Sequence, residues 1–576
     1  MTSLQARRAR RLWLPMGAIC VFAAVVAGRL AWIQVLNHEA FSTEANDELS
    51  AKKDVFGHRG SILDRDGHVL SASIDTWDFW IRTSEWKKPE VALAASDEIA
   101  KALKLSAPDL RRQALEHGLG EFRVARDVDY ETGFALIKSK PDGLIASPNT
   151  KRVNPDGDLA LSVLGIINGD DHGSLGIEYA LDRTLAGRPG SAIFERDSKG
   201  APIPFGRIVT KEPTDGRDVV LSLDRYLQQL AERYLDDAVK QHRAKSGTIL
   251  IMDPNTGGIL ALATLPRLSA ETIARGGEGF ARASRNVAVE DLYEPGSVMK
   301  VITAASAIDA GLVTANSGYV DTGSVKIFDT ELKNWDDNVY GYQTMTGVLQ
   351  HSINTGAVYM AQLLGKERFA EYLDRFGFGR QSGIEMSGES VPIFRRPKDK
   401  GWTPVDLATQ SFGQAISVNA IQMATAFSAV VNGGNMLKPR LVDAYIDPDG
   451  TRHDVPVQVE GRAIKGETSA TMREMLRQVV DPVGRTHPGK PREYTAGGKS
   501  GTANIPVTNG YNDRQIASFI GFAPFENPRV VIYIKLDDNA DGLTGTAAAA
   551  PVFAKLADEV LRFLNVNPDV ARVERR

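Results

Sequence analysis

The feature that most constrains this chain of 576 residues is an apolar stretch near its N-terminus. An uncharged run, Leu12–Gly28, follows four arginines, and the first acidic residue comes only after the run. The run is near the lower limit of length for crossing a bilayer, and it becomes longer if the Arg29 side chain reaches the interface. Arginines beside a span stay in the cytoplasm. The pattern therefore predicts a cytoplasmic tail over 1–11 and a single-pass anchor over 12–36, with the rest of the chain outside. A cleaved signal peptide is the alternative, but the run is long for one and lacks a clear cleavage site.

Composition excludes several classes of chemistry. The formal net charge is −4, so the chain as a whole does not attract nucleic acid, and we expect no nucleic-acid partner. The single cysteine, Cys20, lies inside the apolar run, which excludes disulfides and thiol catalysis for the remainder. The nine histidines do not show the spacing of a metal site. We therefore expect neither a metal nor a cofactor.

The pattern divides the chain after the anchor into two regions and a short tail, 566–576. Residues 37–215 alternate short strands with turns, as in RGSILDRDGHVLSAS, where an Asp-Gly pair separates two strands. Residues 216–565 mix helices with strands, which predicts an α+β domain whose helices flank an antiparallel sheet. In this region we expect a helix capped by Asp224, hairpins in GTILIMDPNTGGILALAT and in RQIASFIGFAP with RVVIYIKLDD, a mostly helical middle, and a last helix, PVFAKLADEVLRFL.

The stretch DLYEPGSVMKVITAASAIDAG is the first that suggests chemistry. Pro295 and Gly296 break the chain before a helix that is apolar almost all round, and this helix carries Ser297 and Lys300. Residues three apart are neighbours on a helix, so the amine can reach the hydroxyl. Burial favours the neutral amine, which can then take the serine proton.

The spacing alone is weak evidence, because Ser-x-x-Lys is expected by chance in a chain of this length. It occurs three times, at Ser50/Lys53, Ser84/Lys87 and Ser297/Lys300. The third copy is the one with a chain break before it and an apolar helix after it. A helix-capping serine with a lysine that reaches solvent fits that copy equally well when it is taken alone.

A second candidate is Ser352-Ile353-Asn354, in MTGVLQHSINTGAVYMAQLLG. A hydroxyl and an amide interrupt two short apolar helical segments there. From a tight turn, the Ser352 hydroxyl could pass a proton, and the Asn354 amide could hold a substrate carbonyl. A plain helix cap is the alternative interpretation of the same residues.

The letters KSGT occur twice, beginning at Lys245 and at Lys499. The first copy ends a predicted helix, where a basic last turn followed by glycine is ordinary helix termination. The second copy follows Gly497 and Gly498 and continues into small residues, so the backbone there can come close to a ligand or a strand. It also follows the other two motifs in chain order, and we assign the chemistry to Lys499.

Together, YEPGSVMK, HSINTG and GGKSGTA resemble the three motifs of the penicillin-binding transpeptidase domain. The segments RGSILDRDG and GSLGIEYALDRTLAGRPG resemble pedestal motifs of class B penicillin-binding proteins, and the FtsI-like, septal branch is the best match. The resemblance covers nearly the whole chain after the anchor. It implies a transpeptidase domain over 216–565, preceded by an elongated β-rich pedestal of the dimerisation type over 37–215.

For this family the resemblance implies a serine D,D-transpeptidase that cross-links peptidoglycan stem peptides. Ser297 would attack the D-Ala–D-Ala carbonyl and form an acyl-enzyme, after Lys300 takes its proton. Ser352 would relay a proton toward the departing D-alanine. Asn354 would hold the acyl-chain amide and Lys300.

The third motif is implied to bind the substrate. Lys499 would supply positive potential, and Ser500 and Thr502 would bind the terminal carboxylate. The backbone N–H groups of Ser297 and Thr502 would form the oxyanion hole. The substrate and β-lactam site would thus consist of Ser297, Ser352, Asn354, Lys499, Ser500, Gly501 and Thr502.

The resemblance also implies partners and a location. Besides stem peptides and β-lactams, it implies a membrane glycosyltransferase of the FtsW/RodA type and other divisome proteins. The protein would lie in the inner membrane with its N-terminus in the cytoplasm and its catalytic domain outside. The sequence does not separate a septal role from a role in elongation.

Two other functions stay open. A serine β-lactamase would hydrolyse the acyl-enzyme, but the Glu-x-x-x-Asn pattern of class A enzymes does not occur between Ser352 and Lys499. A non-catalytic β-lactam sensor or divisome scaffold would bind without turnover. Finally, Arg59, Asp64, Arg65 and Glu178 are interpreted as a charged network that fixes the pedestal strands, not as a second site.

Overall fold

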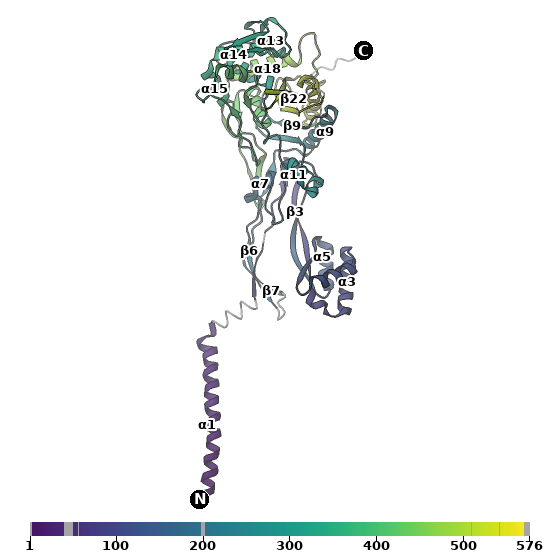
Figure 1. The fold of residues 1–576 in the computed structure, drawn as a ribbon, viewed down its shortest axis with the longest axis vertical. Coiled ribbons are helices and arrows are strands. Elements are labelled where there is room, and N and C mark those ends of the chain that lie inside the picture. The colour runs from purple at the N-terminus through teal and green to yellow at the C-terminus, as the bar shows by residue number, and fades with distance from the viewer. Residues whose placement is uncertain are drawn as a thin grey trace. The chain divides into compact units, whose positions relative to one another are not determined.

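The computed structural model describes residues 3–39, 50–55, 57–196, 202–507, 510–540 and 542–569. The chain divides into two compact units, which are Met1–His58 with Gly187–Asp215, and Arg59–Ala186 with Gly216–Arg576. Figure 1 shows the fold and labels some of the helices and strands named below. Part of the predicted C-terminal tail, from residue 570 onward, lies outside the described residues.

The first unit holds the apolar helix and a small sheet. α1 (Ser3–Ala31) continues into η1 (Trp32–Leu36), and the segment Pro15–Leu36 is long and apolar enough to cross a membrane. The Arg29 guanidinium lies over the Trp32 ring, 4.3 Å from its centroid. These features are consistent with a single-pass anchor. The antiparallel sheet of this unit has the order β1–β6–β7, with β1 (Ser50–Val55), β6 (Gly190–Arg196) and β7 (Pro202–Lys211).

The second unit begins with a sheet built on one long strand. The predicted Asp-Gly turn joins β2 to β3, and its Asp64 carboxylate accepts the N–H groups of Asp66 and His68. Beyond the turn, β3 pairs with both β4 and β5. The sheet continues from β2 through β8 and β18 to β19, so strands distant in sequence share it. The strands are β2 (Ile62–Leu63), β3 (Val69–Arg82), β4 (Glu121–Asp129), β5 (Leu144–Val153), β8 (Asp218–Leu221), β18 (Val442–Ile446) and β19 (Arg452–Asp454).

Three helices between residues 89 and 139, which the strand-and-turn pattern did not predict, pack on β3 and its neighbours. Ser106 and Asp129 cap two of them by accepting backbone N–H groups of the first turn. Their apolar faces bury Phe79 and Ile81 of β3 in a separate small core. The helical elements of this part are η2 (Thr83–Lys87), α3 (Pro89–Leu103), α4 (Ala107–His117), α5 (Tyr130–Ser139), α6 (Leu161–Leu164), α7 (Gly176–Ala180) and α8 (Asp182–Leu185).

A buried charged network ties these strands to α7. The Arg59 Nε donates to Glu178 Oε2 at 2.6 Å, and the Arg152 Nε donates to Glu178 Oε1 at 2.7 Å. Glu178 is 1% exposed. The predicted network is therefore present around Arg59 and Glu178. Asp64 binds backbone N–H groups, and the side chain of Arg65 is exposed.

A five-stranded antiparallel sheet of order β10–β9–β23–β22–β21 forms the centre of the C-terminal part. Both predicted hairpins are present, β9 with β10 and β22 with β23. One face of the sheet packs on α9 and α20, and the other packs on a larger group of helices that includes α12, α14 and α17. The strands are β9 (Ser246–Met252), β10 (Ile259–Leu265), β21 (Gly497–Val507), β22 (Gly510–Ala523) and β23 (Val530–Asp537).

The helices around this sheet follow the predicted pattern. Asp224 caps α9 by accepting the N–H groups of Tyr226 and Leu227. The apolar helix after Ser297 is α12, which is buried almost all round. The helical elements are α9 (Arg225–His242), α10 (Ala270–Arg275), α11 (Gly277–Ala283), η3 (Gly296–Val298), α12 (Met299–Asp309), α13 (Met345–Gln350), α14 (Asn354–Leu364), α15 (Lys366–Arg375), α16 (Pro404–Ser411), α17 (Ala420–Val431), α18 (Gly466–Val480), α19 (Gly545–Ala548) and α20 (Ala550–Phe563).

Small strand pairs interrupt the middle region that the sequence predicts as mostly helical. Two of these pairs lie between α12 and α13, next to the second sequence motif. The pairs are β11 (Gly318–Asp321) with β14 (Gly341–Thr344), β12 (Ser324–Ile327) with β13 (Thr330–Lys333), β15 (Ile393–Phe394) with β16 (Ile416–Ser417), and β17 (Asn435–Leu437) with β20 (Val459–Arg462).

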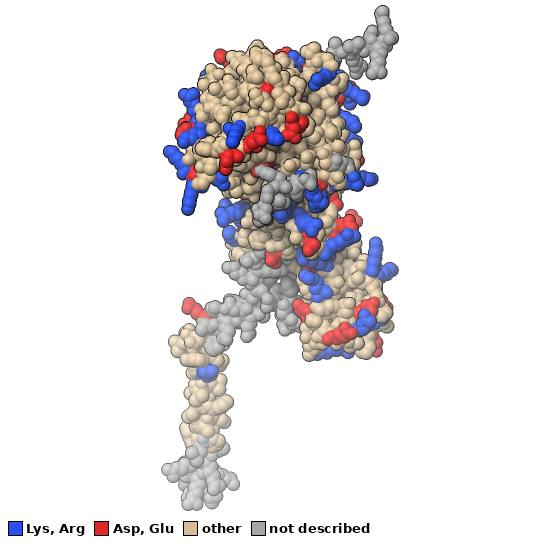
Figure 2. Space-filling view, turned by 45° about the horizontal axis from the view of Figure 1, so that its top comes forward, with Lys and Arg blue, Asp and Glu red and all other residues tan. Residues whose placement is uncertain are grey.

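On the outside of the unit, acidic and basic side chains are interspersed over the face shown in Figure 2.

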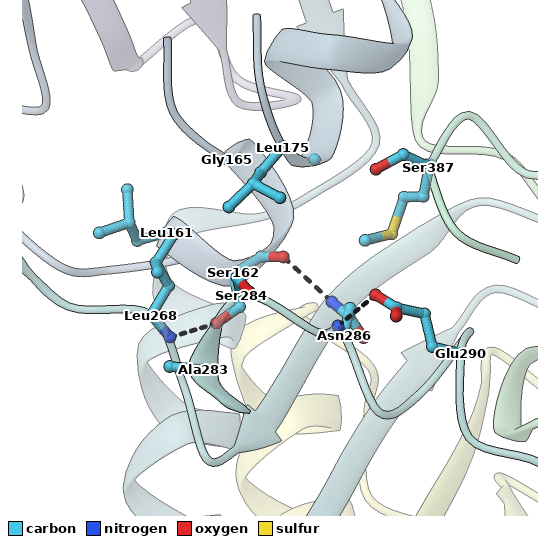
Figure 3. Close-up of a pocket in the computed structure, with 12 residues that line it drawn as sticks. Leu161, Ser162, Gly165, Leu175, Leu268, Ala283, Ser284, Asn286, Glu290 and Ser387 are labelled. Atoms are coloured by element: carbon cyan, nitrogen blue, oxygen red, sulfur yellow. Dashed lines mark hydrogen bonds between the residues drawn. The ribbon is translucent and has the colours of Figure 1, made fainter. Parts of the chain in front are cut away.

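A small cavity of about 10 Å³ lies where the α6 segment meets the loops around α10 and α11. The Ser162 carbonyl accepts from Asn286 Nδ2 at 3.1 Å, and Ser162 Oγ accepts from the Leu268 N–H at 2.8 Å (Figure 3). Such a volume is about that of one water molecule. The predicted catalytic residues do not line this cavity, so it belongs to the joint between two parts of the unit.

Replacing Glu178 by alanine should strongly destabilise the protein, because two arginines would lose their buried anion. The expected loss is about 3–5 kcal/mol, typical of a broken buried pair. The matched control is Glu121→Ala, which removes an exposed partner of Arg82 and should cost less than about 1 kcal/mol. The midpoint of urea unfolding of the full chain in detergent, followed by tryptophan fluorescence, measures both. Equal shifts in the two variants would contradict the role given to Glu178.

Candidate active site

The first motif forms a tight turn against the edge of the five-stranded sheet. Ser297 lies in η3, and Lys300 lies in the first turn of α12. Gly296 has a positive φ of 54°, and a Cβ there would stand 2.7 Å from the carbonyl oxygen of Thr502. Only glycine fits such an approach without a shift. The turn that carries Ser297 is thereby held against β21.

The second motif is a turn between α13 and α14. Ser352 has a φ of 57°, in the left-handed region, which aims its backbone and side chain differently from a continuing helix. The Lys300 amine donates to the carbonyl oxygen of Ser352 and to its Oγ, the latter at 3.2 Å. The Lys499 amine donates to the same Oγ at 3.0 Å. The three sequence motifs therefore meet at the Ser352 hydroxyl, which the lysines of the first and third motifs both contact.

The third motif lies on β21, the edge strand of the sheet. Lys499 is 1% exposed, and its amine also donates to the Ser500 carbonyl at 3.0 Å. Thr502 Oγ1 accepts from the Gly545 N–H at 3.1 Å. A Cβ on Gly501 would stand 2.9 Å from Val298 and 3.0 Å from the Pro295 carbonyl oxygen. The glycine thus allows η3 and β21 to touch, as the sequence predicts for the second KSGT copy.

Burial sets the protonation of both lysines. It lowers the pKa of Lys300 well below its usual range, and the charge of Lys499 lowers it further, while Asp336 opposes the shift. Burial alone lowers the pKa of Lys499 to about 7. A lysine with such a pKa is partly neutral at physiological pH. It can accept a proton or, when charged, attract an anion.

Not all predicted contacts are present. No hydrogen bond reaches the Ser297 hydroxyl from any residue that the structure describes. Asn354 Nδ2 donates to the Lys333 carbonyl at 2.8 Å, and within the same residues it makes no hydrogen bond to Lys300. The first KSGT copy is separate: Lys245 is exposed and forms an ion pair with Asp538 at 2.7 Å. The roles predicted for Ser297 and Asn354 stay predictions.

The structure also shows a buried support behind the second motif. Asn334 Oδ1 accepts the N–H of Asn354 at 3.0 Å and that of Thr355 at 3.4 Å. Asn334 Nδ2 donates to Asp321 at 2.9 Å, and Asp321 is 1% exposed. The sequence analysis missed this network, because its members lie on separate short strands and helices and share no local motif.

Two more ionisable groups lie near the lysines and were also missed. Burial lowers the pKa of His487 to about 4, with the charge of Lys499 as a second cause. Its Nδ1 accepts the Gly489 N–H at 3.0 Å. Asp336 lies on the turn after β13, where a carboxylate in the stretch KNWDDN has no sequence feature that separates it from an ordinary turn residue.

Two known protein families match parts of this chain. The family described as "Penicillin binding protein transpeptidase domain" matches residues 247–558, and "Penicillin-binding Protein dimerisation domain" matches residues 54–221. These matches cover the two regions that the sequence pattern separates. The limits predicted for the domains, 37–215 and 216–565, stay predictions.

Individual relatives span almost the whole chain. The chain is 29% identical over 561 residues to "Probable peptidoglycan D,D-transpeptidase PenA" of Neisseria meningitidis, covering 97% of this chain and 93% of the relative. It is 29% identical over 565 residues to "Peptidoglycan D,D-transpeptidase FtsI" of Escherichia coli, covering 97% and 92%. The crystal structure of penicillin binding protein 3 from Mycobacterium tuberculosis, complexed with aztreonam, matches with a TM-score of 0.70 and 27% identity, covering 90% of this chain and 98% of that one.

Replacing Lys499 by methionine should stabilise the protein near pH 7. The unfolded lysine takes up a proton below about pH 10.4, whereas the folded one does so only near 7. Stability is therefore lost as the pH falls between these values, by roughly 5 kcal/mol in total. Lys499→Met removes this loss, so its melting temperature should exceed that of the wild type at pH 7 and should vary less between pH 7 and pH 10.

The matched control is the lysine of the other KSGT copy. Lys245→Met changes an exposed side chain, so its effect should stay within about 1 kcal/mol at each pH. Differential scanning fluorimetry of the full chain in detergent gives both curves. A Lys499→Met protein that melts below the wild type at pH 7 would show that Lys499 is not a destabilising buried base.

Proposed function

The chain belongs to the class B penicillin-binding proteins, a family of peptidoglycan D,D-transpeptidases, and we propose that it works through an acyl-enzyme on Ser297 in septal cell-wall synthesis. The observation that carries the proposal is the meeting of Lys300 and Lys499 on the hydroxyl of Ser352. This arrangement supplies a path for the protons that acyl transfer must move.

In the first half-reaction, Ser297 Oγ attacks the penultimate D-alanine carbonyl of the donor stem peptide. The bond between the two D-alanines breaks, and the terminal D-alanine leaves. Lys300 takes the Ser297 proton, because burial lowers the pKa of its amine well below the usual range. Ser352 then passes a proton to the departing amine through its contacts with both lysines. Proton transfer of this kind contributes about 10²–10⁴ in rate.

The edge strand is assigned to substrate binding. Lys499 in its charged form attracts the terminal carboxylate, which Ser500 and Thr502 bind. The backbone N–H groups of Ser297 and Thr502 stabilise the oxyanion, and one such donor is worth about 10²–10³ in rate. Support for this arrangement comes from the close contact between η3 and β21 at Gly296 and Gly501.

The same chemistry makes β-lactams ligands of the site, because their ring carbonyl and carboxylate mimic the donor. In this proposal the catalytic domain lies outside the inner membrane and the arginine-rich end lies in the cytoplasm; support comes from the apolar helix near the N-terminus and the arginines that precede its apolar run. A membrane glycosyltransferase of the FtsW/RodA type would supply the uncross-linked strands, and other divisome proteins would assemble with it. Support for a septal role comes from similarity to the relative named FtsI.

A fluorescent penicillin should label the full chain stoichiometrically, and mass spectrometry of the labelled peptide should place the adduct on Ser297. Ser297→Ala should abolish labelling, because the proposed ester forms on the Ser297 hydroxyl. Ser84→Ala is the matched control, since Ser84 and Lys87 share the spacing but lie in the short helix η2, and labelling should persist.

Other outcomes of the same experiments point to the alternatives. Rapid turnover of nitrocefin without a stable adduct would indicate a β-lactamase. Full complementation of a depleted strain by Ser297→Ala would indicate a scaffold whose transpeptidase domain is not needed for catalysis. Either result would overturn the proposed acyl-transfer function.

The rate of acylation should depend on pH in a bell shape. On the acid side the rate rises with pH, because Lys300 must lose its proton to act as the base. Above a pH of about 7 the rate falls, because Lys499 loses the charge that attracts the carboxylate. The second-order rate constant for acylation by a penicillin reports these pKa values in the free protein.

Lys499→Arg separates the two limbs. A guanidinium keeps its charge throughout this range, so the fall above pH 7 should disappear while the acid limb remains. Lys245→Arg is the control and should keep the complete bell. An unchanged alkaline limb in Lys499→Arg would mean that another group causes it.

A further inference from the structure

We propose that Asp336 binds the cationic amine of the acyl acceptor, the neighbouring stem peptide, beside Ser352. The inference rests on the proposed transpeptidase function and concerns its second half-reaction, in which an amine resolves the acyl-enzyme. A primary alkyl amine has a pKa near about 10, so it reaches the site as an ammonium ion. Lys499 repels such a group whenever it carries a charge. An anion on another side of the site is therefore needed to collect the acceptor.

The turn that carries Asp336 is fixed to the second motif. Asn334 accepts the first N–H groups of α14 and also donates to the Asn338 carbonyl at 3.0 Å. The Asn354 amide donates to the Lys333 carbonyl at 2.8 Å. These bonds join both ends of the turn to the segment that holds Ser352. The carboxylate of Asp336 therefore keeps its place relative to the proposed catalytic groups.

The Asp336 carboxylate is ionised but has no cation of its own. It accepts the Tyr340 hydroxyl at 2.6 Å, and Asn338 donates to it through Nδ2 at 2.7 Å and through its N–H at 3.2 Å. Burial alone would raise the pKa of Asp336, but these hydrogen bonds outweigh it and lower the pKa. Among the residues that the structure describes, no lysine or arginine forms an ion pair with it. A half-buried carboxylate of this kind can accept an ammonium group.

Asp336 lies close enough to the second motif and to Lys300 for its charge to act on them. The Tyr340 ring packs against His351, with 5.0 Å between the ring centroids, and His351 directly precedes Ser352. The negative charge of Asp336 acts on both Lys300 and His351, where it opposes the lowering of their pKa values. Trp335, the neighbour of Asp336, is 62% exposed and offers an apolar surface next to the carboxylate.

Charge is thus separated across the site. Lys499 on the edge strand attracts the carboxylate of the donor peptide, and Asp336 on the turn after β13 attracts the ammonium of the acceptor. Ser352 Oγ contacts both lysines, and the turn that carries Asp336 is hydrogen-bonded to Asn354 of the same motif. The arrangement lets one site bind two peptides whose reacting ends differ in sign.

The reaction balances without any further reactant. The bound ammonium first gives one proton to the neutral Lys300 amine or to water. The amine nitrogen then attacks the acyl carbon, and the ester bond to Ser297 Oγ breaks. The second proton passes from nitrogen to Ser297 Oγ, which restores the serine and leaves a new amide bond.

The test measures how the acyl-enzyme partitions between hydrolysis and transfer. The full-length protein is incubated in detergent with a D-Ala–D-Ala pentapeptide and a tripeptide acceptor that bears a free side-chain amine. In Asp336→Asn the concentration of acceptor that gives half-maximal transfer should rise about tenfold, which corresponds to roughly 1.4 kcal/mol of binding. The ratio is taken from acyl-enzyme that has already formed, so it does not depend on the acylation rate.

Two comparisons separate binding from a structural effect. Asp337→Asn changes the adjacent, exposed carboxylate and should leave the partition unchanged. An O-alkyl hydroxylamine acceptor is uncharged at pH 7 and should react equally well with Asp336→Asn and with the wild type. Asp336→Glu should recover part of the preference for the charged acceptor.

The failures are distinguishable. If the wild type forms no acyl-enzyme, the proposed function is wrong and not this inference alone. If acyl-enzyme forms and Asp336→Asn keeps the wild-type partition with the charged acceptor, Asp336 does not bind the amine. An equal loss with the charged and the neutral acceptor would assign Asp336 to positioning of the turn and would also overturn the proposal.

Discussion

The proposed chemistry depends on the burial of two amines around one hydroxyl. Lys300 and Lys499 are almost inaccessible to solvent, and both donate to Ser352 Oγ. Removing a charged amine from water is costly, so the fold shifts each lysine toward its neutral form. In water, both lysine amines would keep their usual, higher pKa values. The apolar layers on both faces of the central sheet supply the free energy that offsets this burial. Amines with such lowered pKa values can exchange protons near neutral pH.

Close backbone contact keeps these bases in place. The turn that carries Ser297 touches the edge strand because Gly296 and Gly501 lack side chains where a Cβ would collide with the opposite backbone. Gly413 allows a similar close approach to the turn itself, because a Cβ on Gly413 would lie 2.1 Å from the Gly296 carbonyl oxygen. An edge strand leaves one row of its backbone groups unpaired by the sheet, which suits β21 for binding a peptide-like substrate. The three glycines thus determine how closely the turn that carries Ser297 can approach β21.

Much of the fold and the site could be predicted from the sequence, but only where a local pattern carried the information. The hairpins of the central sheet, the Asp224 cap and the apolar helix after Ser297 all follow from short periodic patterns, and the structure confirms them. The sequence also distinguished the two KSGT copies, because a helix end precedes the copy at Lys245 and a glycine pair precedes the copy at Lys499. The helices α3 and α4 were missed, since the strand-and-turn pattern was extended over the whole region. Asn334 and Asp321 were missed for a stronger reason: they act together only because distant strands bring them together.

The position of Asp336 has a physical rationale that goes beyond its own contacts. If this carboxylate lay against Lys499, the two charges would pair, Lys499 would stay protonated far above pH 7, and neither group would be free to attract a substrate. Its hydrogen bonds to Tyr340 and Asn338 satisfy the carboxylate in place of a cation. Asn334 ties that turn to the segment that follows Ser352. Separation, and not proximity, therefore allows a basic strand and an acidic turn to serve one reaction between an anionic donor and a cationic acceptor.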